Sequence, residues 1–284
     1  MIGSIELEWR FGTIEVPAPD RYIRQAIQTT GEYSGAEIDL YQSLLRPDDV
    51  AIDVGANVGV FSIAIGLSVG PAGRVLAFEP QPPIYELLKR NLSRPELKQV
   101  QAVRAIVARR DGVAEFIEVQ TLPEGEEVNF GGLGVHSSIR RRYGRFVPTD
   151  VRCIDGLALN RCDFIKIDAE GTEGAVVVGA TATIARCRPV VSFECDRPDV
   201  AGPLVDTFLD AGYRLWRFRG SNMRVPNPKG ATLEGVPNIS ILMLLAVPEE
   251  RLDRLAAADM SALRVVDSRR TFERLSQGIV KDTI

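Results

Sequence analysis

Two acidic segments, each at the end of an apolar run, carry residue types that can bind a nucleoside. The first run, 50–54, contains Asp53 and leads into the turn Gly55-Ala56-Asn57-Val58-Gly59. The second run, 75–78, is followed by Glu79-Pro80. In an α/β sheet such runs become parallel strands, and nucleotides bind in the crevice at their carboxyl ends. The glycines let the backbone approach a ligand, and the Glu79 carboxylate can accept hydrogen bonds from both ribose hydroxyls.

The spacing of the glycines argues against a dinucleotide. A dinucleotide fingerprint has glycine at the first, third and sixth positions of the turn, and here these positions hold Gly55, Asn57 and Val60. An acid before the turn suits a cofactor with a cationic amino-acid end, because Asp53 would face its ammonium and sulfonium groups. We therefore expect S-adenosylmethionine rather than a hydride-transfer cofactor.

The expected cofactor contacts follow the order of the strands. They are Asp53, Gly55, Asn57 and Gly59 with the methionine part, Glu79 with the ribose, Pro80, Val107 and Ala108 with the adenosine, and Asp111 with the exocyclic amine of adenine. Asp111 has an alternative role, which is to start the turn before Gly112. The segment Gly31-Glu32-Tyr33 is a candidate to close over the cofactor.

A third acidic segment follows the apolar run 164–167 and supplies candidate catalytic residues. Methyl transfer from a sulfonium requires the acceptor oxygen to be held in line with the leaving sulfur, and a hydroxyl acceptor must also lose its proton. Asp168 would act there as a base, a metal ligand or an anchor for the acceptor. Its alternative role is a helix N-cap or a partner of Lys166, which points to the same face of the strand. Glu170 is either catalytic or a first-turn acid that interacts with the helix dipole.

Residues 121–149 have many glycines and little periodicity, which is typical of a binding loop or lid. This segment holds His136, the single histidine of the chain. His136 would act as a general base above the methyl group, unless it faces solvent. Asn129 is a further candidate contact with substrate or cofactor. The basic run 140–145 suits a phosphate or carboxylate, although a solvated loop is the simpler interpretation.

Three segments together resemble the FkbM family of class I methyltransferases. They are Asp53-Val54-Gly55-Ala56-Asn57-Val58-Gly59, Phe78-Glu79-Pro80 and Phe164-Ile165-Lys166-Ile167-Asp168-Ala169-Glu170-Gly171-Thr172-Glu173. The resemblance covers roughly residues 37–247. It implies S-adenosylmethionine as methyl donor and O-methylation of a small hydroxylated acceptor, such as a sugar or a secondary metabolite. Asp168, Glu194 and Asp196 could together hold a divalent cation, but the family pattern does not require one, so no metal site is predicted.

The alternation of strand-like and helical segments predicts an α/β fold with a doubly wound, mostly parallel sheet. We expect the methyltransferase domain at residues 37–248, a lead-in or hairpin at 1–36, and a charged helical tail at 249–284. The tail is free to pack on the outside of the domain or on a second subunit, so a homodimer is left open.

Composition narrows the class of protein and its partners. The chain has 284 residues and is 45% hydrophobic, enough to bury a sheet between helices. Its net charge of −4 argues against a nucleic-acid partner. No secretory signal or bilayer-spanning run is visible, and the four cysteines lack a paired metal spacing. These features predict a soluble, cytoplasmic protein with reduced core thiols and no membrane partner.

Two other functions stay open at this stage. One is a nucleic-acid methyltransferase of the same fold, against which stand the acidic balance and the absence of an Asn/Asp-Pro-Pro-aromatic motif. The other is a non-catalytic, cofactor-binding scaffold, for which the acids of segment 168–170 would be incidental.

Overall fold

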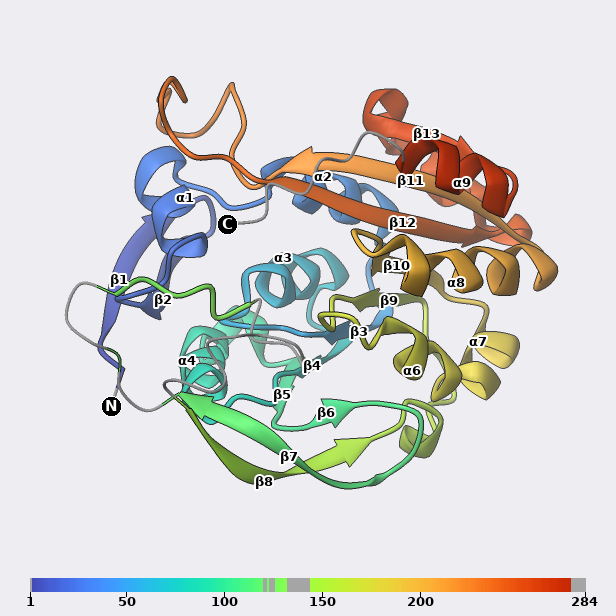
Figure 1. The fold of residues 1–284 in the computed structure, drawn as a ribbon, viewed down its shortest axis with the longest axis horizontal. Helices are drawn as coiled ribbons and strands as arrows, with labels where there is room; N and C mark the ends of the chain where they lie inside the picture. The colour runs from blue at the N-terminus through green and yellow to red at the C-terminus, as the bar shows by residue number, and fades with distance from the viewer. Residues whose placement is uncertain (1, 120–121, 123–125, 132–143, 277–284) are drawn as a thin grey trace.

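The computed structural model describes residues 2–119, 122, 126–131 and 144–276. Within them the largest sheet has eight strands (Figure 1). In spatial order these are β13 (Leu263–Val266), β11 (Tyr213–Ser221), β12 (Ser240–Pro248), β10 (Val190–Glu194), β9 (Phe164–Ile167), β3 (Val50–Val54), β4 (Arg74–Phe78) and β5 (Val100–Val103). The five strands from β10 to β5 are parallel, and β12, β11 and β13 are antiparallel. The predicted doubly wound, mostly parallel sheet is therefore confirmed.

Helices cover both faces of this sheet (Figure 1). On one face lie α2 (Gly35–Leu44), α3 (Val60–Val69) and α4 (Pro82–Leu92), and on the other lie α6 (Glu173–Val178), α7 (Thr181–Cys187), α8 (Pro198–Asp210) and α9 (Arg269–Ser276). Helix α4 shows how the sequence sets such an element. Prolines occupy its first turn, where no backbone donor is needed, and its apolar residues Ile84, Leu87 and Leu88 are buried.

Alternation along the strands decides which side chains each face receives. Ala51 and Phe164 belong to the core under α2 and α3, whereas Ile52 and Ile165 belong to the opposite core. Asp53 lies two residues after Ala51 in β3, and Lys166 lies two residues after Phe164 in β9. The two are register partners in these neighbouring strands. Both side chains therefore point toward α2 and α3.

The N-terminal residues form the hairpin β1 (Ser4–Trp9) and β2 (Gly12–Pro17), followed by α1 (Ile23–Thr30). The hairpin packs on α4 through β2. There the N–H of Glu15 donates to Oδ1 of Asn91, and Nδ2 of Asn91 donates to the carbonyl of Glu15. This extension is thus attached to the parallel half of the domain.

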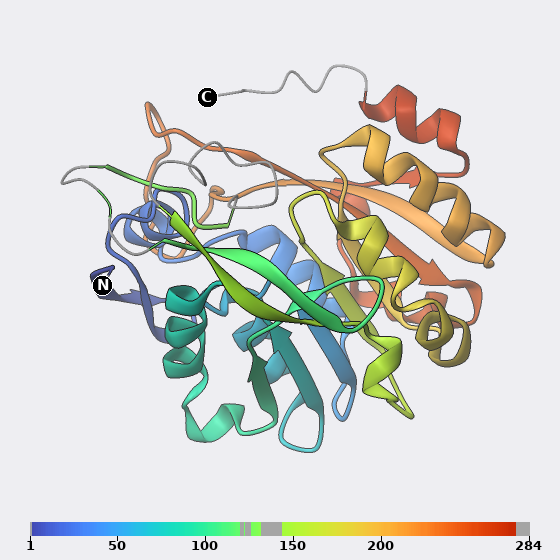
Figure 2. The same ribbon diagram turned by 60° about the horizontal axis from the view of Figure 1, so that its bottom comes forward.

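A small sheet next to β5 differs from the expected arrangement. It consists of β6 (Ile106–Val107), β8 (Gly144–Arg152) and β7 (Gly112–Val119), with β8 in the middle, and Figure 2 shows the β7–β8 pair from the side. The segment 100–107 forms two strands, β5 in the main sheet and β6 in the small one, because the chain turns at Ala105, whose N–H donates to the carbonyl of Val103. Residues 144–149, expected to be irregular, are held as a strand by their ladder with β7.

The C-terminal segment also differs from the helical tail that was expected after residue 248. It begins with 3-10 turns at Glu249–Ala257 and Met260–Ala262, and then adds β13 to the edge of the sheet. Phe272 of α9 is fully buried in the core shared with α8. Residues 249–276 are therefore part of the domain. Among the described residues, no helix has both the length and the apolar character needed to cross a membrane.

Candidate functional site

Two adjoining cavities lie at the carboxyl ends of β3, β4 and β9. One has a volume of about 280 Å³ and mostly apolar walls, and the other has a volume of about 370 Å³ and more polar walls. Five residues line both cavities: Gly55, Glu79, Gly131, Asp168 and Glu170. The two spaces are thus parts of one continuous crevice. We call the apolar part the adenosine slot, after the ligand expected from the sequence, and the polar part the inner cavity.

The adenosine slot has the walls that a planar base requires. Its apolar lining consists of Val54, Phe78, Pro80, Ala105, Ile106, Val107, Ala114 and Phe116. Pro80 and Val107 lie where the sequence placed them. Ala108 does not line the slot, because its N–H donates to the carbonyl of Arg152 and its own carbonyl packs against Gly179. Asp111 is also absent from the lining. Its carboxylate accepts the N–H of Cys153 at 2.7 Å, so it joins the start of β7 to the segment after β8.

Glu79 is held rigidly between the two cavities. Its Oε1 accepts the backbone N–H of Gln81 at 2.9 Å, and its Oε2 accepts that of Asn57 at 3.0 Å. Burial raises the pKa of this carboxyl to about 7, while these two N–H groups act in the opposite direction. Each oxygen retains a lone pair, so the carboxylate can still accept two hydroxyl groups from a ligand.

The turn after β3 has the left-handed backbone that its glycines suggest. Gly55, Asn57 and Gly59 have φ of 77°, 50° and 97°. A Cβ at Gly55 would overlap the backbone carbonyl oxygen of Asp168, so only glycine fits where β3 and β9 meet the crevice. Asn57 lines the inner cavity, as expected. Gly59 does not; it precedes α3, and a side chain there would press on Leu88.

The prediction that Asp53 contacts the cofactor is wrong. This side chain is fully buried and lines neither cavity. Its Oδ2 accepts the hydroxyl of Ser62 at 2.6 Å, and its Oδ1 lies 3.3 Å from the ammonium of Lys166. The reason is the alternation of β3, which directs residue 53 under α3 instead of along the crevice. Asp53 is therefore linked to the cavity only through its ion pair with Lys166.

Lys166 connects this buried pair to the inner cavity. Its ammonium has no solvent exposure, lines the cavity, and lies 3.6 Å from Oδ2 of Asp168. Burial disfavours the charged form, but the carboxylates of Asp53, Asp168 and Glu37 outweigh it and raise the pKa of Lys166. Asp168 thus has its alternative role as a partner of Lys166, and it borders both cavities, whereas its role as base, metal ligand or anchor stays a prediction.

Acidic side chains gather at the outer end of the inner cavity. Carboxylate oxygens of Asp168, Glu170 and Glu194 lie within 4.8 Å of one another. The sequence analysis grouped Asp196 with Asp168 and Glu194, whereas in the structure the third member of the group is Glu170. Arg197 lies 3.0 Å from Glu170 and 3.3 Å from Glu194, and this guanidinium supplies the positive charge that the group needs. Burial and then the charge of Asp168 raise the pKa of Glu170 to about 7.

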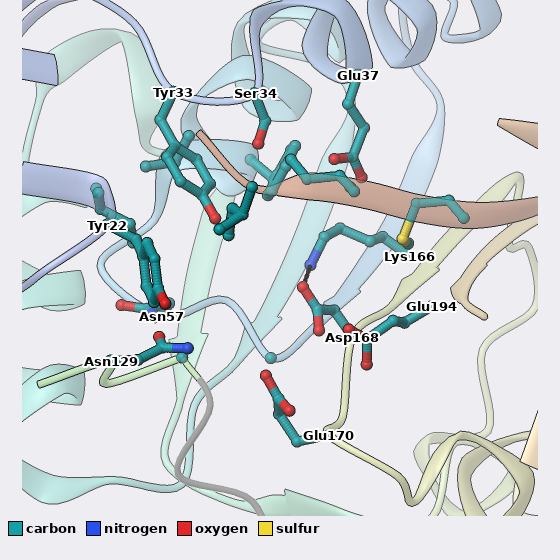
Figure 3. Close-up of a pocket in the computed structure, with 18 of the residues that line it drawn as sticks. Tyr22, Tyr33, Ser34, Glu37, Asn57, Asn129, Lys166, Asp168, Glu170 and Glu194 are labelled. Atoms are coloured by element: carbon teal, nitrogen blue, oxygen red, sulfur yellow. Dashed lines mark ion pairs between the residues drawn. The ribbon is translucent and has the colours of Figure 1, made fainter. Parts of the chain in front are cut away.

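The remaining wall of the inner cavity was largely missed by the sequence analysis. Tyr22 and Ile23 lie at or just before the start of α1, and Tyr33, Ser34 and Glu37 lie at or just before the start of α2. Residues 240–243 form the start of β12, and Ile239 precedes it. Figure 3 shows the Tyr33 ring directed into the cavity, Tyr22 beside Asn57, and Glu37 on the same side of the cavity as Lys166. Only Tyr33, in the segment suggested to close over the cofactor, was anticipated. An acid on the apolar side of α2 was the available signal for Glu37.

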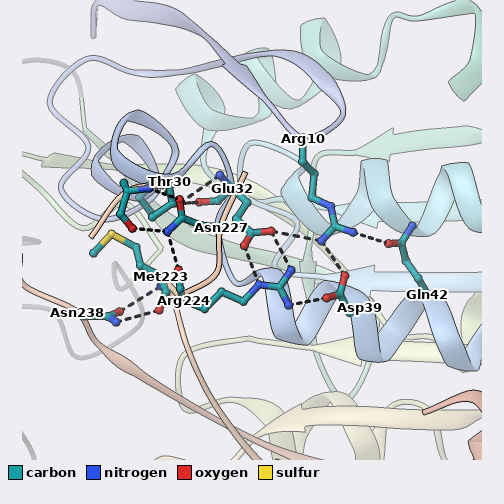
Figure 4. Close-up of polar contacts among 11 residues, drawn as sticks. Arg10, Thr30, Glu32, Asp39, Gln42, Met223, Arg224, Asn227 and Asn238 are labelled. Carbon is teal, nitrogen blue, oxygen red and sulfur yellow. Dashed lines mark hydrogen bonds and ion pairs between the residues drawn. The ribbon is translucent and has the colours of Figure 1, made fainter. Parts of the chain in front are cut away.

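A buried cluster of charges fixes this wall (Figure 4). Glu32, whose side chain is 1% exposed, accepts two hydrogen bonds from Arg224 at 2.7 and 3.2 Å and one from Arg10 at 3.4 Å. Both arginines also pair with Asp39 of α2. The cluster joins the hairpin, α2 and the segment after β11 immediately beside Tyr33.

Replacing Glu32 by glutamine should therefore loosen the wall. We expect the free energy of unfolding to fall by about 2 kcal/mol, as for a lost set of hydrogen bonds to charged groups. Urea denaturation measures this, with Glu86→Gln as the control, since its exposed pair with Lys89 should contribute less than about 0.5 kcal/mol. Equal losses in the two variants would show that the Glu32 cluster does not hold the wall.

Three expectations concern the segment after β7. Asn129 lines the inner cavity, and the side-chain amide of Gln81 donates to the carbonyl of the neighbouring Phe130 at 2.8 Å. His136 and the arginines at 140–142 lie outside the described residues. Arg145, the last residue of the basic run, pairs with Glu118 at 2.5 Å.

The fold and the crevice define the class of protein as Rossmann-like class I methyltransferases. A profile of the methyltransferase FkbM domain matches residues 53–215, and the chain belongs to this family. The resemblance found in the sequence is thereby confirmed.

Three individual proteins that are similar to this chain share 30% sequence identity with it or less. AMB antimetabolite synthetase AmbE of Pseudomonas aeruginosa is 30% identical over 212 residues, which are 63% of this chain and 10% of AmbE. Methyltransferase sdnD of Sordaria araneosa is 28% identical over 197 residues, 59% of this chain and 74% of sdnD. The crystal structure of methyltransferase FkbM from Methylobacillus flagellatus has 18% identity and a TM-score of 0.47, covering 78% of this chain and 50% of that one. The chain thus spans a tenth of AmbE and half of the crystallised protein.

Proposed function

We propose that this protein transfers a methyl group from S-adenosylmethionine to a hydroxyl of a small molecule. The observation that carries the proposal is the position of Glu79 between the two cavities. Both oxygens of its carboxylate are fixed by backbone N–H groups, and each has a lone pair left for a ribose hydroxyl. A nucleoside with its base in the adenosine slot would direct its remaining part past Gly55 and Asn57.

The residues of the crevice suit S-adenosylmethionine in particular. The backbone approaches the ligand closely at Gly55, where a side chain has no room. The carboxylates of Asp168 and Glu170 line the adjoining space and would favour a cationic end. When bound, the cofactor would supply a methyl group on a positively charged sulfur, and the protein would orient the acceptor and exclude water.

A small hydroxylated acceptor fits the rest of the crevice better than a nucleic acid. The inner cavity, of about 370 Å³, would have to hold the methionine part as well as the acceptor. Its acidic lining and the net charge of −4 would repel a phosphate backbone. AmbE, one of the similar proteins, is named as an antimetabolite synthetase, which is in line with a secondary metabolite as acceptor. Asp168, which borders both cavities, is the candidate anchor of the acceptor hydroxyl.

Cofactor binding tests the proposal directly. Calorimetric titration should give saturable binding of S-adenosylmethionine and none of NAD. Glu79→Ala removes two charge-assisted hydrogen bonds and should weaken binding about 100-fold. A well-folded wild-type protein that does not bind S-adenosylmethionine would refute the proposal and favour a scaffold function.

The pH dependence of binding provides an independent check on Glu79. Ribose hydroxyls donate to the ionised carboxylate, whose pKa burial raises to about 7 in the free protein. Affinity for S-adenosylmethionine should therefore fall as the pH decreases below 7, by up to about tenfold per pH unit. Glu79→Gln should bind weakly with a flat profile over this range. The same slope in the variant would mean that another group titrates.

A further inference from the structure

A buried carboxyl group and a buried ammonium group both belong to the lining of the inner cavity, beyond the proposed cofactor contacts. The carboxyl group belongs to Glu37 of α2, which is 3% exposed, and the ammonium group belongs to Lys166 of β9, which is fully buried. Both side chains line the cavity, and Figure 3 shows them on the same side of it. Charged groups are placed in such a position only when something compensates their desolvation.

Glu37 has a hydrogen-bond partner that suits both of its protonation states. The hydroxyl of Tyr41 donates to Oε1 of Glu37 at 2.6 Å, and it lies 2.8 Å from the hydroxyl of Ser192, where either group can be the donor. Two hydroxyls in series can reverse their direction when a proton arrives at the carboxylate. Glu79 differs in this respect, because its partners are backbone N–H groups that can only donate.

Lys166 has unused donors. Within the described residues its ammonium forms ion pairs with Asp53 and Asp168 at 3.3 and 3.6 Å but no hydrogen bond, and it also lies 4.7 Å from the centre of the Phe61 ring. Its Nζ atom has less than 1 Å² of accessible surface, so the ammonium would act on an oxygen of a bound molecule mainly through its charge beside the cavity. The oxygen that lies between Lys166 and Glu37 would be that of the acceptor.

We propose that Glu37 removes the proton of the acceptor hydroxyl, while Lys166 stabilises the oxygen as it is methylated. The inference rests on the proposed O-methyltransferase function. In the step, the acceptor oxygen forms a bond to the methyl carbon and the carbon–sulfur bond breaks, its electron pair remaining on the now neutral sulfur. The hydroxyl proton goes to the carboxylate of Glu37 and leaves to water after the product departs.

The surroundings of Glu37 set the pH at which it can act. Burial raises the pKa of Glu37 to about 7. Tyr41 of the same helix and Lys166 of β9 lower this pKa, and Asp168 just after β9 and Asp53 of β3 raise it further. A base must be ionised to accept a proton, so the methylation rate should rise with pH through about 7. Tyr41→Phe removes a donor to the carboxylate and should move this rise to higher pH.

A binding experiment tests the position of Glu37 without any acceptor. Sinefungin carries a cationic amine in place of the methylsulfonium group, and S-adenosylhomocysteine lacks the methyl group. Wild type should prefer sinefungin, and Glu37→Gln should reduce that preference about tenfold by removing a charge-assisted contact. Glu15→Gln, which removes a charge on the N-terminal hairpin, is the control and should keep the preference. An unchanged preference in Glu37→Gln overturns the proposal.

Turnover measurements test the proposed role of Glu37 as the base. With an acceptor found by transfer of a labelled methyl group to a panel of sugars, polyols and hydroxy acids, Glu37→Gln should lower kcat by about 10²- to 10⁴-fold. The affinity for S-adenosylhomocysteine, which has no charge at the sulfur, should stay unchanged, which separates this result from a failure of the proposed function. A kcat within twofold of wild type, or a pH profile that Tyr41→Phe does not move, contradicts the assignment of Glu37 as the base.

Discussion

Gly55→Ala should abolish binding of S-adenosylmethionine and lower the free energy of unfolding by about 3 kcal/mol or more. Two effects add at this position. An alanine would have to adopt a φ of 77°, and its Cβ would overlap the carbonyl oxygen of Asp168. That oxygen cannot withdraw easily, since the N–H of Asp168 is bonded to Val54 and that of Gly55 to Phe78. Urea denaturation and calorimetric titration measure the two losses.

Gly230→Ala is the matched control for backbone strain. Gly230 has a φ of 61°, and a Cβ there would meet no atom within 4 Å. It should cost about 1–2 kcal/mol, the penalty of a left-handed conformation, and should leave cofactor binding intact. If Gly55→Ala behaves like Gly230→Ala, then the close approach of β3 and β9 does not shape the crevice.

The positions of Gly55 and Glu79 at the crevice could be predicted because they are encoded locally. Gly55 and Glu79 immediately follow their strands, and in a parallel sheet such residues share one edge regardless of what packs around it. For the same reason Asp168, at the end of the neighbouring strand, could be placed beside them from the sequence.

The rest of the site could not be predicted, because it depends on the direction of side chains and on partners that are distant in the sequence. Asp53 was placed at the crevice because it stands at the end of an apolar run, but the alternation of β3 turns it under α3. The hydroxyl chain from Glu37 depends on a contact between Tyr41 and Ser192, which are 151 residues apart. No local pattern announces such a contact. Asp111 was misplaced because the chain leaves the main sheet at Ala105 and forms a second, smaller sheet.

Lys166→Met should lower the free energy of unfolding by about 3–5 kcal/mol, as expected when one partner of a buried ion pair is removed. Asp53 is fully buried, and without the ammonium at 3.3 Å only the hydroxyl of Ser62 would compensate its charge. Lys89→Met is the control, because its pair with Glu86 is exposed and should contribute less than about 0.5 kcal/mol. Urea denaturation at constant pH compares the two variants.

A second substitution separates the lost charge pair from lost packing. Asp53→Asn combined with Lys166→Met removes the uncompensated carboxylate while keeping the volume of both side chains, so most of the lost stability should return. A double variant as unstable as Lys166→Met alone would mean that methionine fits poorly among Phe61 and the strands, and that charge is not the cause. Recovered stability without recovered methylation would instead indicate that the buried pair is retained for the ammonium of Lys166 beside the cavity. A neutral pair would fold as well, but it could not stabilise the acceptor oxygen.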